Sequence, residues 1–239
     1  IKEIGEDRFA AIGSDTMGNT KWAREGVVDD IPTMLIVPGP CHHLSNTIGD
    51  ITRLPYFTSA LTKMHTTISH FSHPSNSTTH LKVLQVSQHI NHGLEKVGKT
   101  RFGTFYWSGY ALVGCLPPIC ELVATGDTKA ALGWFKQILT YQKFELELKQ
   151  LVTILEPLAR AIKCLEGLEV TVGDVWKFYV VVTAVLHDLF EENVLSFPES
   201  LQDNVCSIVN LRFDEMIHGP SGDLYLAGFY LDPGNPPVV

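Results

Sequence analysis

The stretch FAAIGSDTMGNTKWARE (residues 9–25) decides how the fold begins. Its apolar run ends at Ser14, Asp15 follows directly, and a turn of small residues leads into apolar residues at helical spacing. We therefore predict a strand over 8–14 and a helix over 19–28. Asp15 then either caps this helix, as Asp commonly does, or holds a metal ion at the end of the strand.

A second apolar run, residues 34–37, is closed by Pro38, Gly39 and Pro40, which stop a strand or a helix at that point. Two strands joined through a helix usually lie parallel in one sheet. The carboxyl ends of such strands face the ligand crevice of open α/β sheets, and Asp15 is expected there.

Beyond residue 40 the apolar pattern becomes helical. The three- and four-residue steps cover 44–51, 57–71, 144–165, 172–189 and 201–216. Pro157 lies inside the strongest of these patterns and is expected to kink that helix or divide it in two. Residues 223–231 are expected to form a closing strand.

The predicted fold is α/β plus all-α: a partial sheet interrupted by a helical insertion, and predominantly helical overall. The expected boundaries are 1–40 for the opening of the sheet, 41–220 for the helical insertion and 221–239 for the strand that rejoins the sheet. Because the sequence starts with Ile1, we expect it to be a segment of a longer protein.

Composition narrows the function classes. A formal charge of −8 over 239 residues argues against loose electrostatic attraction of the whole chain to nucleic acid, so such contacts must be local. Five cysteines without short paired spacings favour free thiols in a reducing compartment. No uninterrupted apolar run reaches the roughly 18 residues of a membrane span, so no membrane association is expected.

Histidines gather between His42 and His92, close to Cys41, and raise the question of a zinc site. Structural zinc sites need four ligands, usually as two close pairs, and Cys41 stands alone beside adjacent histidines. Polar helix faces and a loop over residues 71–80 are the favoured interpretation. The sequence contains neither a phosphate-binding glycine loop nor a nucleophile elbow.

Cations adjoin aromatic residues at Gly98-Lys99-Thr100-Arg101, directly before an aromatic cluster that starts at Phe102. A cation beside aromatic rings can hold a phosphate while a ring stacks on a base. The alternative is that these rings, at helical spacing, belong to the core.

Four motifs resemble transposases of the hAT superfamily, particularly copies from fungal genomes. They are SDTMGNTKWA (14–23), CHHLSNTI (41–48), KTRFGTFYWS (99–108) and DLYLAGFYLDP (223–233). They occur in the family's order and span nearly the whole chain. The resemblance implies an RNase H-like catalytic domain with a helical insertion.

The resemblance also implies functional residues and partners. Asp15 would be the second of three carboxylates that hold two Mg²⁺ or Mn²⁺ ions for DDE-type DNA cleavage and strand transfer. Asn19 would secure the turn, Cys41 and His42 would match the Cys/His motif, and Arg101 with Phe102 would contact DNA. The partners would be transposon ends in the nucleus, and the family leaves room for a homo-oligomer.

Two departures accompany the resemblance. The family spaces its Cys and His by two residues, whereas Cys41, His42 and His43 are contiguous, and Phe102 replaces the usual Trp. The family's first Asp and its Glu would fall outside these residues, so the segment would be inactive alone. The alternative function is a transposon-derived DNA-binding or scaffolding protein without catalysis.

Overall fold

The computed structural model describes residues 3–15, 18–98, 103–126, 128, 130–219 and 222–234. After a short 3₁₀ helix, η1 (Glu6–Arg8), strand β1 (Ala11–Ser14) leads to helix α1 (Gly18–Asp30) and strand β2 (Leu35–Pro38). The two strands pair in parallel, with Ala11 opposite Leu35 and Ser14 opposite Pro38. The predicted strand–helix–strand opening is therefore confirmed.

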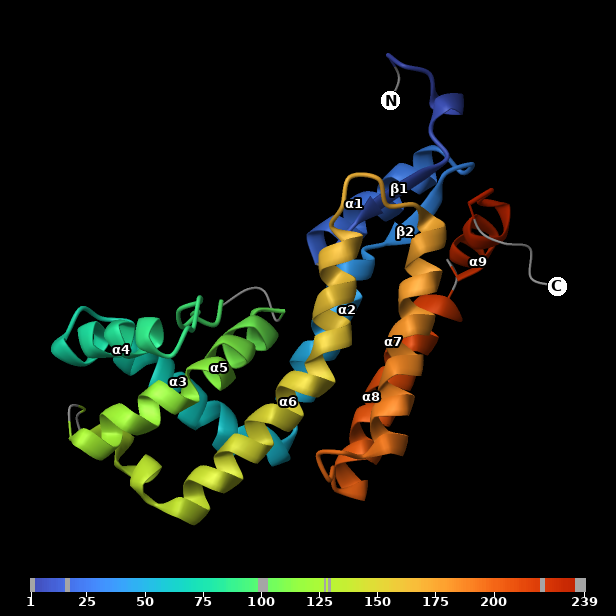
Figure 1. The fold of residues 1–239 in the computed structure, drawn as a ribbon. Helices are drawn as coiled ribbons and strands as arrows, with labels where there is room; N and C mark the ends of the chain where they lie inside the picture. The colour runs from blue at the N-terminus through green and yellow to red at the C-terminus, as the bar shows by residue number, and fades with distance from the viewer. Residues whose placement is uncertain are drawn as a thin grey trace.

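Helices make up most of the remaining described chain, as predicted (Figure 1). They are α2 (Pro40–Thr52), α3 (Thr58–Phe71), α4 (Asn76–Ser87), α5 (Thr104–Thr125), α6 (Ile138–Leu165), α7 (Val172–Glu192), α8 (Glu199–Ile217) and α9 (Gly222–Leu231), with 3₁₀ helices η2 (Pro55–Phe57) and η3 (Ala130–Lys136). The domain boundaries expected at residues 40 and 221 remain a prediction.

Helix α6 is the axis of the helical region. Its predicted apolar face is buried, with Phe144, Leu148, Leu151 and Leu155 fully inaccessible to solvent. Helices α2, α3, α5 and α7 pack directly against α6, whereas α4 packs against α5 and α8 against α2 and α7 (Figure 1). Helix α6 thus runs through one continuous core to which all these helices contribute buried residues.

Of the two outcomes expected at Pro157, a kink or a division of the helix, the division is wrong. The helix runs without a break from Ile138 to Leu165. Proline removes a backbone hydrogen bond at a cost of about 3 kcal/mol in a helix interior. Leu155 and Leu158, on either side of Pro157, are both buried in the core, and this packing holds the helix together across the proline.

The closing segment is helix α9, so the strand expected over 223–231 is also wrong. A short apolar run does not distinguish a strand from a buried helix, and here packing decides. A Cβ on Gly173 of α7 would lie 2.8 Å from the carbonyl oxygen of Gly228, so the two helices meet at glycines. The segment still returns to the sheet, because the hydroxyl of buried Tyr225 donates to Pro38 O at 2.9 Å.

Residues 71–80 are not one loop, because α4 begins at Asn76 with Ser75 as its N-cap. The Ser75 side chain accepts a hydrogen bond from the Thr78 amide at 3.2 Å, which satisfies one free donor of the first turn. The signal was present in the sequence as a serine before a helical segment. The many short polar residues of the segment 71–80 favoured the loop interpretation.

Helix α5 is the one described helix that is long and apolar enough to cross a membrane, judged by length and composition. Core helices of soluble proteins pass the same test, and 56% of its apolar window is buried inside the structure. Its packing against α4 and α6 is visible in Figure 1.

Candidate functional site

The end of β1 is fixed by Arg24, a residue of α1 that is only 4% exposed. Its Nη1 donates to Ser14 O at 2.8 Å, and also to Ser14 Oγ and Asp15 O. Its Nε is buried without a hydrogen-bond partner among the described residues. The helix that follows β1 therefore holds the turn at the strand's carboxyl end.

Asp15 is exposed directly after β1, at the position the sequence predicts. The hydroxyl of Thr20 donates to Asp15 Oδ1, and it also lies 3.1 Å from Asp15 O. Asn19, expected to secure this turn, is exposed, and within the described chain no hydrogen bond from its side chain to Asp15 is found. Thr20 and Arg24, rather than Asn19, hold the turn.

Gly39 lets the end of β2 approach the end of β1. A Cβ at this position would lie 2.9 Å from Ser14 O and 3.3 Å from Asp15 Cα, both backbone atoms. Real Cβ atoms scarcely come that close, so only glycine fits without a shift. The close approach places the first turn of α2 beside Asp15.

A pocket of about 570 Å³ opens at this point. Its wall combines Asp15 with three helix ends: the start of α2 (Gly39, Pro40, Cys41, His42 and Ser45), the start of α5 (Gly103, Thr104 and Trp107) and the end of α6 (Ala159, Ile162, Lys163, Leu165 and Glu166). Asp15, Cys41 and His42, three of the predicted residues, are thus brought together. Asn19 does not line the pocket.

Cys41 is half-buried in the first turn of α2, with its Sγ 3.9 Å from Ile162 O. Burial raises the pKa of the Cys41 thiol, and the Glu166 carboxylate raises it further. The thiol is therefore protonated at neutral pH and is a poor nucleophile. His42, also half-buried, presents an imidazole to the same pocket.

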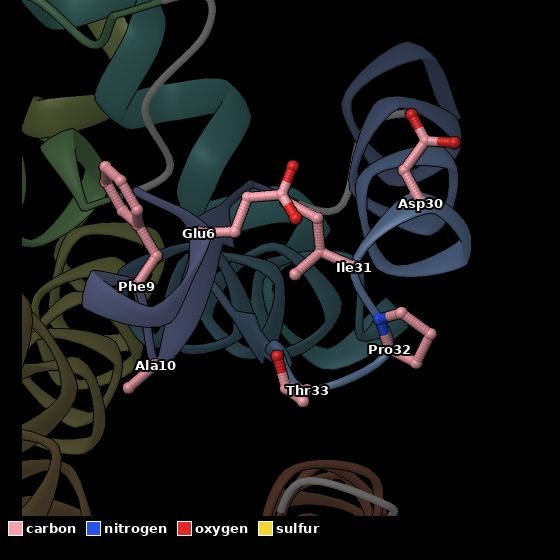
Figure 2. A pocket seen from close by; sticks show the side chains of 7 residues that line it. All are labelled: Glu6, Phe9, Ala10, Asp30, Ile31, Pro32 and Thr33. Carbon is pink, nitrogen blue, oxygen red and sulfur yellow. The ribbon is translucent and has the colours of Figure 1, made fainter. Parts of the chain in front are cut away.

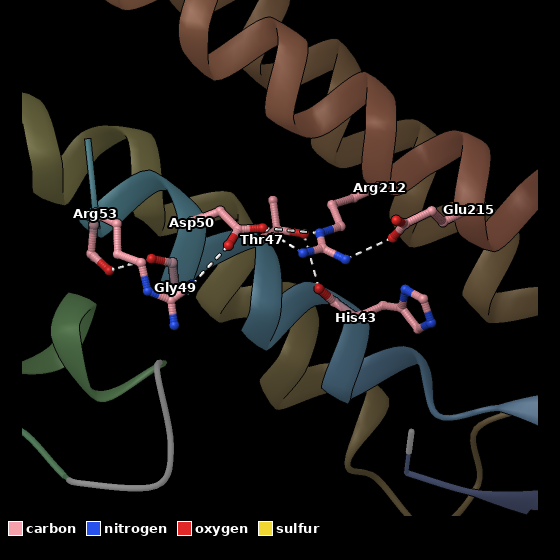
Figure 3. Close-up of polar contacts among 8 residues, drawn as sticks. His43, Thr47, Gly49, Asp50, Arg53, Arg212 and Glu215 are labelled. Carbon is pink, nitrogen blue, oxygen red and sulfur yellow. Dashed lines mark hydrogen bonds and ion pairs between the residues drawn. The ribbon is translucent and has the colours of Figure 1, made fainter. Parts of the chain in front are cut away.

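His43 belongs to a different cluster (Figure 3). There Arg212 of α8 donates from Nε to Asp50 Oδ2 at 3.1 Å and from Nη1 to Glu215 Oε2 at 2.7 Å. The Nδ1 atom of His43 is buried without a partner among the described residues, and burial lowers the pKa of His43. This polar cluster joins α2 to α8, away from the pocket.

The start of α5 supplies an aromatic wall. Trp107 lines the pocket and is 39% exposed, and Lys163 of α6 lines the same pocket. Arg101 and Phe102, the predicted DNA contacts, lie outside the described residues. Gly103 and Thr104, which follow them directly, are part of the pocket wall.

The metal predicted at Asp15 needs further ligands. Within the described ranges, no three His, Cys, Asp or Glu side chains lie close enough together to hold a metal ion. Asp15 supplies carboxylate oxygen, which Mg²⁺ prefers, but these residues do not complete a site by themselves. A metal site at Asp15 would require carboxylates from outside the described residues.

A hollow of about 960 Å³ lies at the opposite ends of the strands (Figure 2). Its wall combines residues 9–10, before β1, with residues 30–33, before β2, and with Glu6. None of the predicted functional residues lines it. The candidate site is therefore the pocket at the carboxyl ends.

Sequence reasoning missed several pocket features. The role of Arg24 was not anticipated, and Gly39 was interpreted only as a residue that ends a strand. Trp107 was visible as a member of the aromatic cluster, but its exposure depends on packing. Glu166 joins the pocket only because α6 ends beside α2, a contact over a sequence distance that local patterns do not report.

No family model, curated protein or solved structure matches this chain.

Proposed function

We propose that the chain is part of a hAT-like DNA transposase whose intact form cleaves DNA and transfers strands by DDE chemistry on an RNase H-like domain. The observation that carries the proposal is the shared pocket. An exposed strand-end carboxylate, the Cys41-His42 turn and the start of α5 lie around one pocket, although they come from motifs far apart in the sequence.

Asp15 would contribute one oxygen ligand for Mg²⁺ or Mn²⁺, with further carboxylates from residues beyond this sequence. In such sites the bound metal ions polarise phosphate oxygens and activate the attacking hydroxyl. The task of Arg24 and Thr20 would be to hold the turn, and thus the Asp15 carboxylate, in one orientation. The segment alone would be inactive.

DNA would enter beside the start of α5. Trp107 offers a partly exposed ring and Lys163 an ammonium group in the same pocket, which suits a base stacked on the ring and a phosphate near the cation. We propose that Arg101 and Phe102 extend this contact. The overall charge of −8 confines favourable contacts to such local groups.

The catalytic proposal is tested by nicking of terminal-repeat DNA with the full-length protein in Mg²⁺ or Mn²⁺. Asp15→Ala should abolish nicking, whereas Asp29→Ala, an exposed carboxylate on α1, should leave it unchanged. Full activity of Asp15→Ala would eliminate the metal role.

DNA binding is tested separately with a fluorescent hairpin that carries an unpaired terminal base. Trp107→Ala should weaken binding by about 1 to 3 kcal/mol, the usual contribution of one stacked base. Trp22→Ala is the matched control, because Trp22 is 79% exposed on α1. If binding depends on Trp107 but no nicking occurs in the full-length protein, the non-catalytic DNA-binding alternative is favoured.

A further inference from the structure

Helices α7 and α8 lie side by side (Figure 1) and form a surface groove between them. The groove has a volume of about 600 Å³ and takes its walls from both helices. Leu186, Phe190, Val205 and Val209 line it and are at most 8% exposed, so its floor is apolar.

The apolar surface continues over the outer face of α7. Val180, Val181 and Val185 are 40%, 53% and 44% exposed, and Ala184 between them is exposed as well. Residues 178–186 of α7 (FYVVVTAVL) contain no charged residue, and a helical segment that is apolar on nearly all sides is normally buried on all sides. In this structure the outer face of α7 has no cover among the described residues.

A second, smaller groove borders the same face. It measures about 350 Å³ between α6 and α7, and Pro157, Ala161, Val181 and Val185 are among its lining residues. The exposed valines of α7 therefore form a ridge between two grooves. Contiguous apolar surface of this kind is typical of interaction sites.

The charge around the α7/α8 groove has one sign. Residues 178–211 contain five acidic residues and neither Lys nor Arg. Glu191 and Asp203 line the groove, and Asp188 is exposed near it. In the described chain neither Glu191 nor Asp203 is paired with a Lys or Arg.

We propose that this groove is the docking site for an amphipathic helix of a partner protein, with an apolar stripe flanked by Lys or Arg. The α7 side of the groove extends from Val180 to Glu191, roughly 16 Å at 1.5 Å per residue, which matches three turns of a docked helix. The apolar stripe would cover the floor, and its basic flanks would meet Glu191 and Asp203.

The acidic rim decides between occupants. A second copy of this chain would set the same acidic rim against itself, because a two-fold interface uses the same surface on both subunits. Nucleic acid would bring phosphates to carboxylates. A cationic helix is the occupant that both the apolar floor and the negative rim favour, and this inference is independent of the proposed transposase activity.

The test uses a fluorescent synthetic 18-residue Leu/Lys amphipathic helix as the probe, titrated with the chain at about 0.15 M salt, where long-range attraction is screened. We expect the double variant Glu191→Lys/Asp203→Lys to bind at least about tenfold more weakly, a loss of about 1.4 kcal/mol. Val180→Gln/Ala184→Gln, which changes only the apolar wall, should weaken binding similarly. Circular dichroism spectra of the variants should match that of the unchanged chain, which checks that they fold.

The matched control is Glu25→Lys/Asp29→Lys, which makes the same charge change on exposed positions of α1. It should leave the affinity within about twofold. A Leu/Glu peptide of the same apolar pattern should not bind the unchanged chain. If the control weakens peptide binding as much as the groove variants do, the peptide is held by general charge attraction and the proposal is overturned. An affinity that the groove variants do not change would overturn it as well. A dimer of the free chain that Val180→Gln/Ala184→Gln dissociates would identify a second copy as the occupant and overturn it too.

Discussion

Gly39 lies where the end of β2 passes the end of β1. The two backbones approach so closely there that no room remains for a side chain at position 39. A methyl group there would meet the Ser14 carbonyl at 2.9 Å, and neither backbone can move without disturbing the sheet. We expect Gly39→Ala to lower the free energy of unfolding by about 1 to 3 kcal/mol, as overpacked sites do, in urea titrations.

Gly26 provides the control for this substitution. It lies within α1, and a Cβ there would meet no atom within 4 Å. Gly26→Ala should therefore stabilise the chain by about 0.5 to 1 kcal/mol through helix propensity. Equal effects of the two substitutions would show that the close approach at Gly39 is not tight.

His43 should make stability sensitive to mild acid. Burial lowers its pKa in the folded chain, so the unfolded chain binds a proton more readily. Its contribution to stability is present above the unfolded pKa of about 6.5 and is lost as the pH falls through the lower folded pKa. His43→Gln should flatten the fall of Tm between about pH 7 and 5, and His73→Gln, at an exposed position, should not.

Helix α7 begins with a capping box. Thr171 Oγ1 accepts from the Asp174 amide at 3.3 Å, and Asp174 Oδ2 accepts from the Thr171 amide at 2.8 Å, which makes a capping box. We expect Thr171→Ala to cost about 1 kcal/mol in unfolding free energy. Thr171→Ser keeps the hydroxyl and should cost much less, so equal losses would contradict the capping role.

The elements show which parts of the fold the sequence predicts. Period and turn chemistry gave the opening strand–helix–strand and the long helices, because apolar spacing directly reports which face is buried. They failed at α9, where a short apolar run fits two structures. At Pro157 they allowed a kink or a division, and the division does not occur because packing on both sides of the proline outweighs a local penalty. The pocket's Asp15 was predictable from its strand end, whereas Glu166 and Trp107 depend on how distant helices meet.

Over the whole molecule, the contact between Asp50 of α2 and Arg212 of α8 joins residues far apart in the sequence. Their side chains are only 27% and 22% exposed, so the pair is partly shielded from water. A double-mutant cycle with Asp50→Asn and Arg212→Gln should give a coupling of about 1 to 2 kcal/mol. Arg53→Gln, which removes a more exposed partner of Asp50, should cost at most about 0.5 kcal/mol.

The course of α6 limits how the protein can be divided. Its 28 residues would extend roughly 42 Å, and α2, α3, α5 and α7 all pack against it around one core. A split-protein design that cuts within α6 would leave each half with an apolar wall facing water, and both halves should aggregate.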